Sequence, residues 1–145
     1  MAQSVKLSDG SYIDASAVYD TDRQETVEDA LKCSYLALGP YIAAKGYSYQ
    51  GPSSFAIRQG HLVMLSINAC AGSSATAANT VWCTLPEEYR PSKTTSSGSL
   101  CFCGQELMGT RTNLYCKILA SGDVVTYTSV PAGSWWAANI TYWVD

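Results

Sequence analysis

Charged side chains are scarce in this chain, and their scarcity excludes several classes of function. Of its 145 residues, 14% are Asp, Glu, Lys or Arg, and the nine basic residues are scattered along a sequence with a net charge of −3. An average globular protein has roughly 25% charged residues. A nucleic-acid-binding surface gathers Lys and Arg because it has to neutralise phosphates. We therefore expect neither a nucleic-acid partner nor binding to anionic lipid.

Long hydrophobic runs are also missing. Stretches such as Leu62 to Leu65 fall far short of the ~20 residues that a membrane-spanning helix needs. The polar N-terminus, Met1 to Gly10, has neither the basic nor the apolar region of a secretory signal peptide. The sequence predicts no membrane insertion and no export by that route. A chain of this length can still bury a self-sufficient core without metals or disulfides.

Groups that could perform catalysis are few. The single histidine, His61, directly follows a Gln-Gly turn, where a solvated or cross-strand imidazole is the ordinary outcome. Glu87 and Glu88 are adjacent and would diverge on extended backbone, whereas the two carboxyl groups of a glycosidase converge within about 5–10 Å. The sequence has no calcium loop and no glycine-rich phosphate motif. We expect a non-enzymatic protein with no catalytic residue, no cofactor and no metal.

The six cysteines form an even set. Thiols of a protein that is not exported are normally reduced, and Cys is among the residue types most often buried. Cys101 and Cys103 are two apart, so on a strand they share one face and, with Cys83 or Cys116, could make a tetrahedral thiolate site. We expect buried free thiols, and a disulfide or a zinc site are the alternatives.

The first 40 residues have a pattern of their own. Two short alternating runs flank Asp9-Gly10, which predicts a small hairpin. Between Thr21 and Leu38 apolar residues recur at three-and-four spacing, which predicts one helix that Gly39-Pro40 ends. We assign residues 1–40 to an N-terminal hairpin plus helix that attaches or trimerises the protein.

From Tyr41 onward the pattern is all-β. About seven strand-like runs lie between Gly, Pro, Asn and Ser residues, namely Phe55 to Arg58, His61 to Ala69, Thr80 to Leu85, Gly98 to Cys103, Thr112 to Ala120, Asp123 to Ser129 and Ser134 to Val144. Ser121-Gly122-Asp123 is a tight-turn signal, so the strands beside it should pair antiparallel. The spacing predicts a mainly β fold, an antiparallel, jelly-roll-like β-sandwich head over residues 41–145.

Aromatic residues stand out near the C-terminus. Trp135 and Trp136 are neighbours, so on a strand their indoles point to opposite faces and cannot both fill one core. The alternatives for them are the domain core, a subunit interface and a ligand platform. We place a saccharide site, if the protein has one, at Trp135, Trp136, Tyr127 and Arg111, because aromatic faces stack on sugars and a guanidinium hydrogen-bonds hydroxyls or acidic groups.

One segment predicts a structural corner. Pro86 and Pro91 bracket a turn and force the residues before them toward extended geometry. Tyr89 can bury its ring while its hydroxyl keeps a partner. Arg90 is placed to bond backbone carbonyls or a neighbouring subunit's carboxylate. We interpret these four residues as architecture rather than as a ligand site.

The same segment carries a family resemblance. Thr84-Leu85-Pro86-Glu87-Glu88-Tyr89-Arg90-Pro91-Ser92 resembles the "LP-x-x-YRP" segment of C-terminal receptor-binding head domains in bacteriophage tail fibres, baseplate proteins and other minor structural proteins. The order of the surrounding segments is similar too: the Arg58 to Val63 hairpin upstream, Ile118 to Val124 downstream, and the closing run Ile140 to Val144. Together they cover residues ~50 to 145 of the chain.

The resemblance implies a virion structural protein that is assembled in the host cytoplasm. It implies a homotrimer of β-sandwich heads at the tail tip, in contact with other tail or baseplate proteins, which adheres to a host-surface saccharide or protein. Copies held together gain avidity because the second contact is effectively intramolecular. The alternatives are a capsid or tail decoration protein without receptor binding and a cellular carbohydrate-binding module. A glycan depolymerase is the least favoured, for want of convergent carboxylates.

Overall fold

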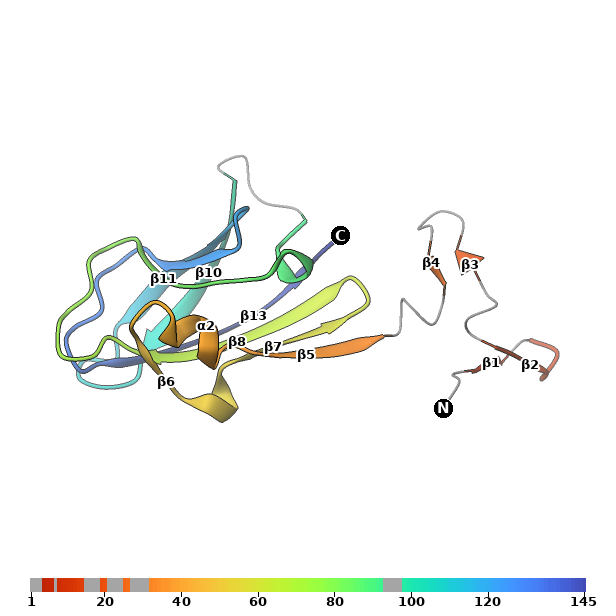
Figure 1. Ribbon diagram of the computed structural model, residues 1–145, viewed down its shortest axis with the longest axis horizontal. Coiled ribbons are helices and arrows are strands. Elements are labelled where there is room, and N and C mark those ends of the chain that lie inside the picture. Colours follow the sequence, from red (N-terminus) through yellow and green to blue (C-terminus); the bar gives the residue numbers. More distant parts are fainter. Residues whose placement is uncertain (1–3, 7, 15–18, 21–24, 27–31, 93–97) are drawn as a thin grey trace.

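The computed structural model describes residues 4–6, 8–14, 19–20, 25–26, 32–92 and 98–145. Its main element is one nine-stranded antiparallel sheet that curls into a half-barrel (Figure 1). The strands in sheet order are β5 (Cys33–Ala37), β7 (Phe55–Gln59), β8 (Leu62–Cys70), β13 (Trp135–Trp143), β10 (Ser99–Glu106), β11 (Asn113–Leu119), β12 (Asp123–Thr126) and β9 (Thr80–Thr84), while β6 (Ser48–Tyr49) pairs with β8. The predicted mainly antiparallel β fold is confirmed.

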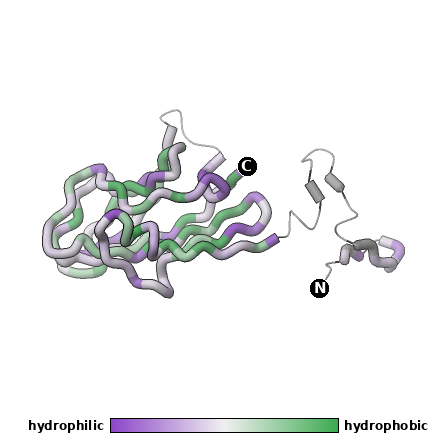
Figure 2. The backbone as a smooth tube through the Cα atoms, viewed as in Figure 1, coloured by the Kyte–Doolittle hydropathy of each residue, from purple (hydrophilic) through white to green (hydrophobic). Residues whose placement is uncertain are grey.

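Alternation of apolar and polar residues explains why these segments form strands. The longest ladder joins β13 to β8, from Trp135 opposite Cys70 to Trp143 opposite Leu62. Along β8 buried and more exposed residues alternate, as expected of a sheet with one covered face. Figure 2 shows that hydrophobic residues are spread along the strands rather than gathered in one segment. Each of the seven strands expected after residue 40 is present.

The turn between β11 and β12 forms as its residues predict. The two strands pair antiparallel, with Ile118 opposite Val124. Gly122 has φ +89°, a left-handed conformation that favours glycine. The Thr84 hydroxyl donates to Asp123 Oδ1 at 2.6 Å and the Ser121 hydroxyl donates to Oδ2 at 2.8 Å. The Thr84 bond above all holds the pKa of the Asp123 carboxyl below its ordinary value.

The predicted helix over Thr21–Leu38 is wrong where the structure describes it. Residues 33–37 form β5, which pairs along its whole length with β7. Ser34 and Leu36 are half-buried, whereas Cys33, Tyr35 and Ala37 are exposed. This alternation has the period of two that is typical of a strand. Gly39-Pro40 begins a helix instead of ending one, because proline fits the first turn of α2 (Gly39–Ala43). Residues 21–24 and 27–31 lie outside the described residues.

The N-terminal segment contains two small strand pairs. The hairpin predicted around Asp9-Gly10 is present as β1 (Ser4–Lys6) and β2 (Tyr12–Asp14). The Asp9 carboxylate accepts hydrogen bonds from the backbone N–H and the hydroxyl of Ser11, which lower its pKa. A second pair joins β3 (Tyr19–Asp20) to β4 (Glu25–Thr26). β5 (Cys33–Ala37), which precedes residue 41, also belongs to the main sheet.

The core lies on the concave side of the half-barrel. Trp82 on β9 and Trp136 on β13 are fully buried, and their rings meet edge to face at 5.1 Å between centroids. These strands stand four places apart in the sheet, so the curl brings its two parts face to face. Ile42 of α2 is also fully buried and helps to close this core. Within the described part of the chain, no helix has the length and hydrophobicity to span a membrane.

Candidate functional site

The LP-x-x-YRP segment forms a corner that is bonded to two strands of the sheet, β5 and β13. A 3₁₀ turn, Glu87–Tyr89, follows Pro86. Tyr89 is buried, and its hydroxyl lies 2.9 Å from Ser34 Oγ on β5. The Tyr142 hydroxyl on β13 donates to the Tyr89 carbonyl at 2.7 Å. Burial raises the pKa of the Tyr142 hydroxyl, so this donor stays protonated at physiological pH.

Arg90 completes the corner. Its Nε donates to the Leu85 carbonyl at 3.1 Å, and Pro91 beside it is buried. The glycine of the β11–β12 turn packs against both, because a Cβ added at Gly122 would lie 2.6 Å from the Leu85 carbonyl oxygen and 2.9 Å from Arg90 Nε. Pro86, Tyr89, Arg90 and Pro91 therefore lie together as one structural unit.

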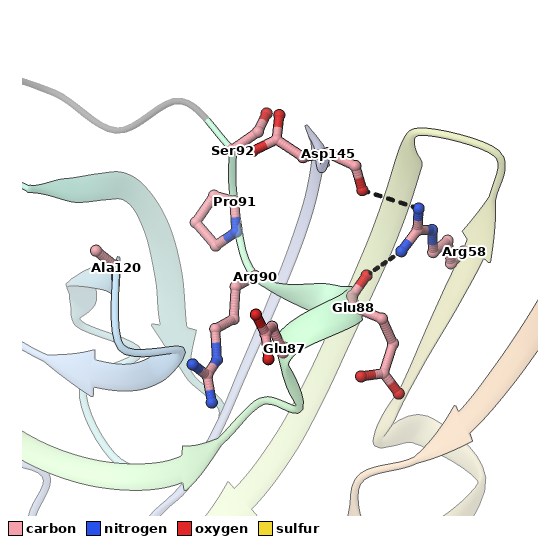
Figure 3. A pocket seen from close by; sticks show the side chains of 8 residues that line it. All are labelled: Arg58, Glu87, Glu88, Arg90, Pro91, Ser92, Ala120 and Asp145. Carbon is pink, nitrogen blue, oxygen red and sulfur yellow. Dashed lines mark hydrogen bonds between the residues drawn. The ribbon is translucent and has the colours of Figure 1, made fainter. Parts of the chain in front are cut away.

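A polar pocket of about 580 Å³ opens beside this corner (Figure 3). Residues of both charges line it, together with small neutral ones: Arg58, Glu87, Glu88, Arg90, Pro91, Ser92, Ala120 and Asp145. Arg58 donates from Nε to the Gly60 carbonyl at 2.7 Å, from Nη1 to the Glu88 carbonyl at 2.6 Å and from Nη2 to the Asp145 carbonyl at 3.0 Å. The Arg58 guanidinium therefore links the backbone of Glu88 at the corner to the backbone of Asp145.

The structure places one of the four residues predicted for a saccharide site in the core and leaves the other three partly or fully exposed. Trp136 is 0% exposed and packs on Trp82 in the core, so it is not part of a surface platform. Trp135 is half-buried on the opposite face of β13, as their adjacency requires. Arg111 lies exposed in the β10–β11 turn and Tyr127 lies exposed just after β12, at the end of the sheet where β13 begins.

Tyr127 belongs instead to an aromatic surface on the outer side of β10, β11 and β12. Tyr115 stands opposite Cys103, and the Tyr127 N–H donates to the Tyr115 carbonyl at 2.7 Å, so the three residues cross the sheet in one row. Tyr115 is 64% exposed and Tyr127 41%. We name this surface the tyrosine face and define it as Cys101, Cys103, Tyr115, Lys117 and Tyr127. A shallow hollow of about 540 Å³ lies on it, lined largely by apolar atoms.

A lysine gives the tyrosine face a polar partner. Lys117 Nζ lies 4.0 Å from the centroid of the Tyr127 ring, within cation–π range. The same ammonium donates to Asn79 Oδ1 at 3.2 Å. Two open aromatic rings beside a cation and an amide can stack on an apolar ring face and at the same time bond to hydroxyl or carboxylate groups.

The cysteines divide into two groups. All six are free: Cys70, Cys83 and Cys116 are buried, and Cys33, Cys101 and Cys103 are exposed. The expectation of buried thiols is thus right for three and wrong for the other three. Burial raises the pKa of the Cys83 and Cys116 thiols to about 12. Within the described ranges, no three His, Cys, Asp or Glu side chains gather as ligands for a metal ion.

Sequence reasoning missed Tyr115 and Lys117, although the signal was available. Both alternate with the buried Leu114, Cys116 and Ile118 along one predicted strand, which puts them on its outer face. What the sequence could not supply was the register that places Tyr127 beside Tyr115.

No family model matches this chain, and no curated protein matches it.

Proposed function

We propose that this chain is the tip protein of a bacteriophage tail fibre or baseplate, and that its head binds a host-surface saccharide without catalysis. The observation that carries the proposal is the tyrosine face, where Tyr115 and Tyr127 remain open to solvent beside Lys117. Exposed aromatic rings with adjacent polar groups are the ordinary means of stacking on sugars and are enriched at binding hot spots.

The fold agrees with this proposal. The residues that resemble the phage segment also build the corner between β5, β13 and the β11–β12 turn, so the resemblance involves residues with a physical role. The edge-to-face contact between Trp82 and Trp136 supports a sandwich-like head, since it joins the two parts of the curled sheet across a shared core. In the proposal, three such heads assemble into a homotrimer at the tail tip, in contact with other tail or baseplate proteins.

The binding mechanism follows from the side chains of the tyrosine face. The two rings would receive the apolar faces of sugar rings, and Lys117 would bond hydroxyl or carboxylate groups at their edges. One such site binds weakly because it is shallow and open. Three copies held together would compensate, since the second and third contacts are effectively intramolecular. In this proposal Tyr127 stays in the predicted site, and Tyr115 takes the place of the buried Trp136.

Replacing both tyrosines should abolish most of the binding. The Tyr115→Ala and Tyr127→Ala double variant is expected to bind immobilised bacterial surface polysaccharides at least tenfold more weakly, equivalent to about 1.4 kcal/mol or more. Fold and oligomer should persist because both side chains are exposed. Surface plasmon resonance on a set of polysaccharides measures the difference.

Tyr12→Ala is the matched control, since this tyrosine is also exposed, at 67%, but lies on the N-terminal hairpin. It should bind as the unchanged protein does. Equal binding by the double variant would refute the tyrosine face as the site. Loss of the oligomer in the double variant would instead favour the decoration protein.

A further inference from the structure

A second exposed surface lies on the outer side of the strands that begin the sheet. Tyr35 on β5, Ile57 on β7 and Met64 on β8 stand in one cross-strand row. The neighbouring row brings Leu62 opposite Trp143 of β13. We name this surface the β5–β8 face; its large apolar residues are Tyr35, Phe55, Ile57, Leu62, Met64 and Trp143. Tyr35 and Phe55 stack with their ring centroids 5.9 Å apart.

The β5–β8 face is open to solvent although it is apolar. Tyr35 is 62% exposed, Trp143 59% and Met64 42%. Since a large aromatic side chain carries roughly 150–250 Å² of surface, the open parts of these residues and of Leu62 amount to roughly 400 Å². Contiguous apolar patches of that size on a soluble protein commonly mark an interaction site.

The outward residues of the three strands β5, β7 and β8 carry no charge. On β5, β7 and β8 the residues that alternate outward are Cys33, Tyr35, Ala37, Phe55, Ile57, Gln59, Leu62, Met64, Ser66 and Asn68. None of them is Asp, Glu, Lys, Arg or His, whereas the tyrosine face holds the cation of Lys117. Arg58 of β7 is not part of the face, because its guanidinium bonds the carbonyls of Glu88 and Asp145 at the corner.

We propose that further copies of this chain pack on the β5–β8 face and that this contact closes the homotrimer. In a cyclic trimer the same residues of the three copies surround one axis, where charges of one sign would repel each other, so an uncharged apolar face suits this self-association. β5 is the terminal strand of the described sheet and directly follows the N-terminal segment. Packing on this face therefore also covers the outer side of this edge strand and brings the β5 strands of the three copies together. The inference rests on the proposed function, because it names the interface of the proposed trimer.

Light scattering after size exclusion under reducing conditions tests the interface. The unchanged protein should have three times the chain mass of 15.6 kDa, and the Tyr35→Glu and Met64→Glu double variant should fall to 15.6 kDa. Both side chains face outward, so the far-ultraviolet circular dichroism should not change. Tyr115→Glu is the matched control, because it places the same charge on an exposed tyrosine of the other face and should leave the mass at three chains.

Each outcome decides the inference. A folded double variant that keeps the mass of three chains, or an unchanged protein that is a monomer, overturns it. If the double variant loses its circular dichroism, Trp143→Ala replaces it, and a dissociation constant of the trimer that rises less than tenfold overturns the inference. Polysaccharide binding by the same samples separates the two proposals. A trimer that binds no saccharide refutes the saccharide site and leaves the interface standing, whereas a monomer that binds saccharide refutes the interface and leaves the saccharide site standing.

Discussion

Replacing Trp136 with alanine should remove about 3–5 kcal/mol of the free energy of unfolding, the range found for large aromatic residues deleted from cores. Trp136 is fully buried and packs edge to face on Trp82, whose indole N–H donates to Thr126 Oγ1 at 3.0 Å. This pair joins β13 to β9 across the core. A cavity left at Trp136 therefore weakens the contact between the two parts of the curled sheet.

Trp136→Phe is the matched control. Among the described residues the Trp136 indole N–H is buried without a hydrogen-bond partner, so phenylalanine keeps a ring beside Trp82 and removes an unpaired polar group. Its cost should be smaller than that of alanine, because phenylalanine fills more of the space and leaves a smaller cavity. Urea unfolding at a fixed protein concentration measures both variants. A cost of Trp136→Ala below that of the control would contradict the core that we describe.

The second large effect is expected at Gly122. Gly122→Ala should cost about 2–4 kcal/mol, because it adds a Cβ both to a left-handed backbone and into occupied space. The residue has φ +89°, and its Cβ would lie 2.6 Å from the Leu85 carbonyl oxygen. That oxygen also accepts the Arg90 bond, so the substitution distorts the corner as well as the turn.

Gly46→Ala separates the two causes of this effect. Gly46 has nearly the same φ, +85°, but a Cβ there would meet nothing within 4 Å. Gly46→Ala should therefore lower the free energy of unfolding by only the cost of the left-handed backbone, about 1–2 kcal/mol. The difference between the two midpoints of urea unfolding measures the close packing of the corner. If the two variants unfold alike, the packing of Gly122 against Leu85 and Arg90 adds nothing to stability.

The strands after residue 40 could be predicted because apolar and polar residues alternate along them and because turn residues such as glycine mark where they end. The segment Asp123 to Thr126, for example, follows a Gly turn and pairs back on β11 in the expected way. The prediction of a helix over Thr21–Leu38 was wrong for a physical reason. Three-and-four spacing over a short stretch also satisfies a strand, and the partner that decides between them, β7, lies some twenty residues further along the chain.

The candidate site could be predicted only in part. The corner could be predicted because proline restricts the backbone and because a buried tyrosine needs a partner for its hydroxyl. The residues that bond to the corner could not be predicted. Adjacency of Trp135 and Trp136 required that they face opposite sides of a strand, but the sequence does not say which side becomes the core. The tyrosine face depends on register between β11 and β12, which places Tyr127 next to Tyr115. Such cross-strand neighbours are a property of pairing rather than of local sequence.

Binding to intact cells tests the central proposal most directly. Fluorescently labelled protein should stain at least one strain in a panel of bacteria, as measured by flow cytometry. Staining should fall at least tenfold after mild periodate oxidation of the cells, because periodate destroys vicinal diols of surface saccharides. It should fall to a similar extent for the Tyr115→Ala and Tyr127→Ala double variant. Staining that survives both treatments, or a trimer that stains no strain, would contradict a tail-tip protein that recognises host saccharide through the tyrosine face.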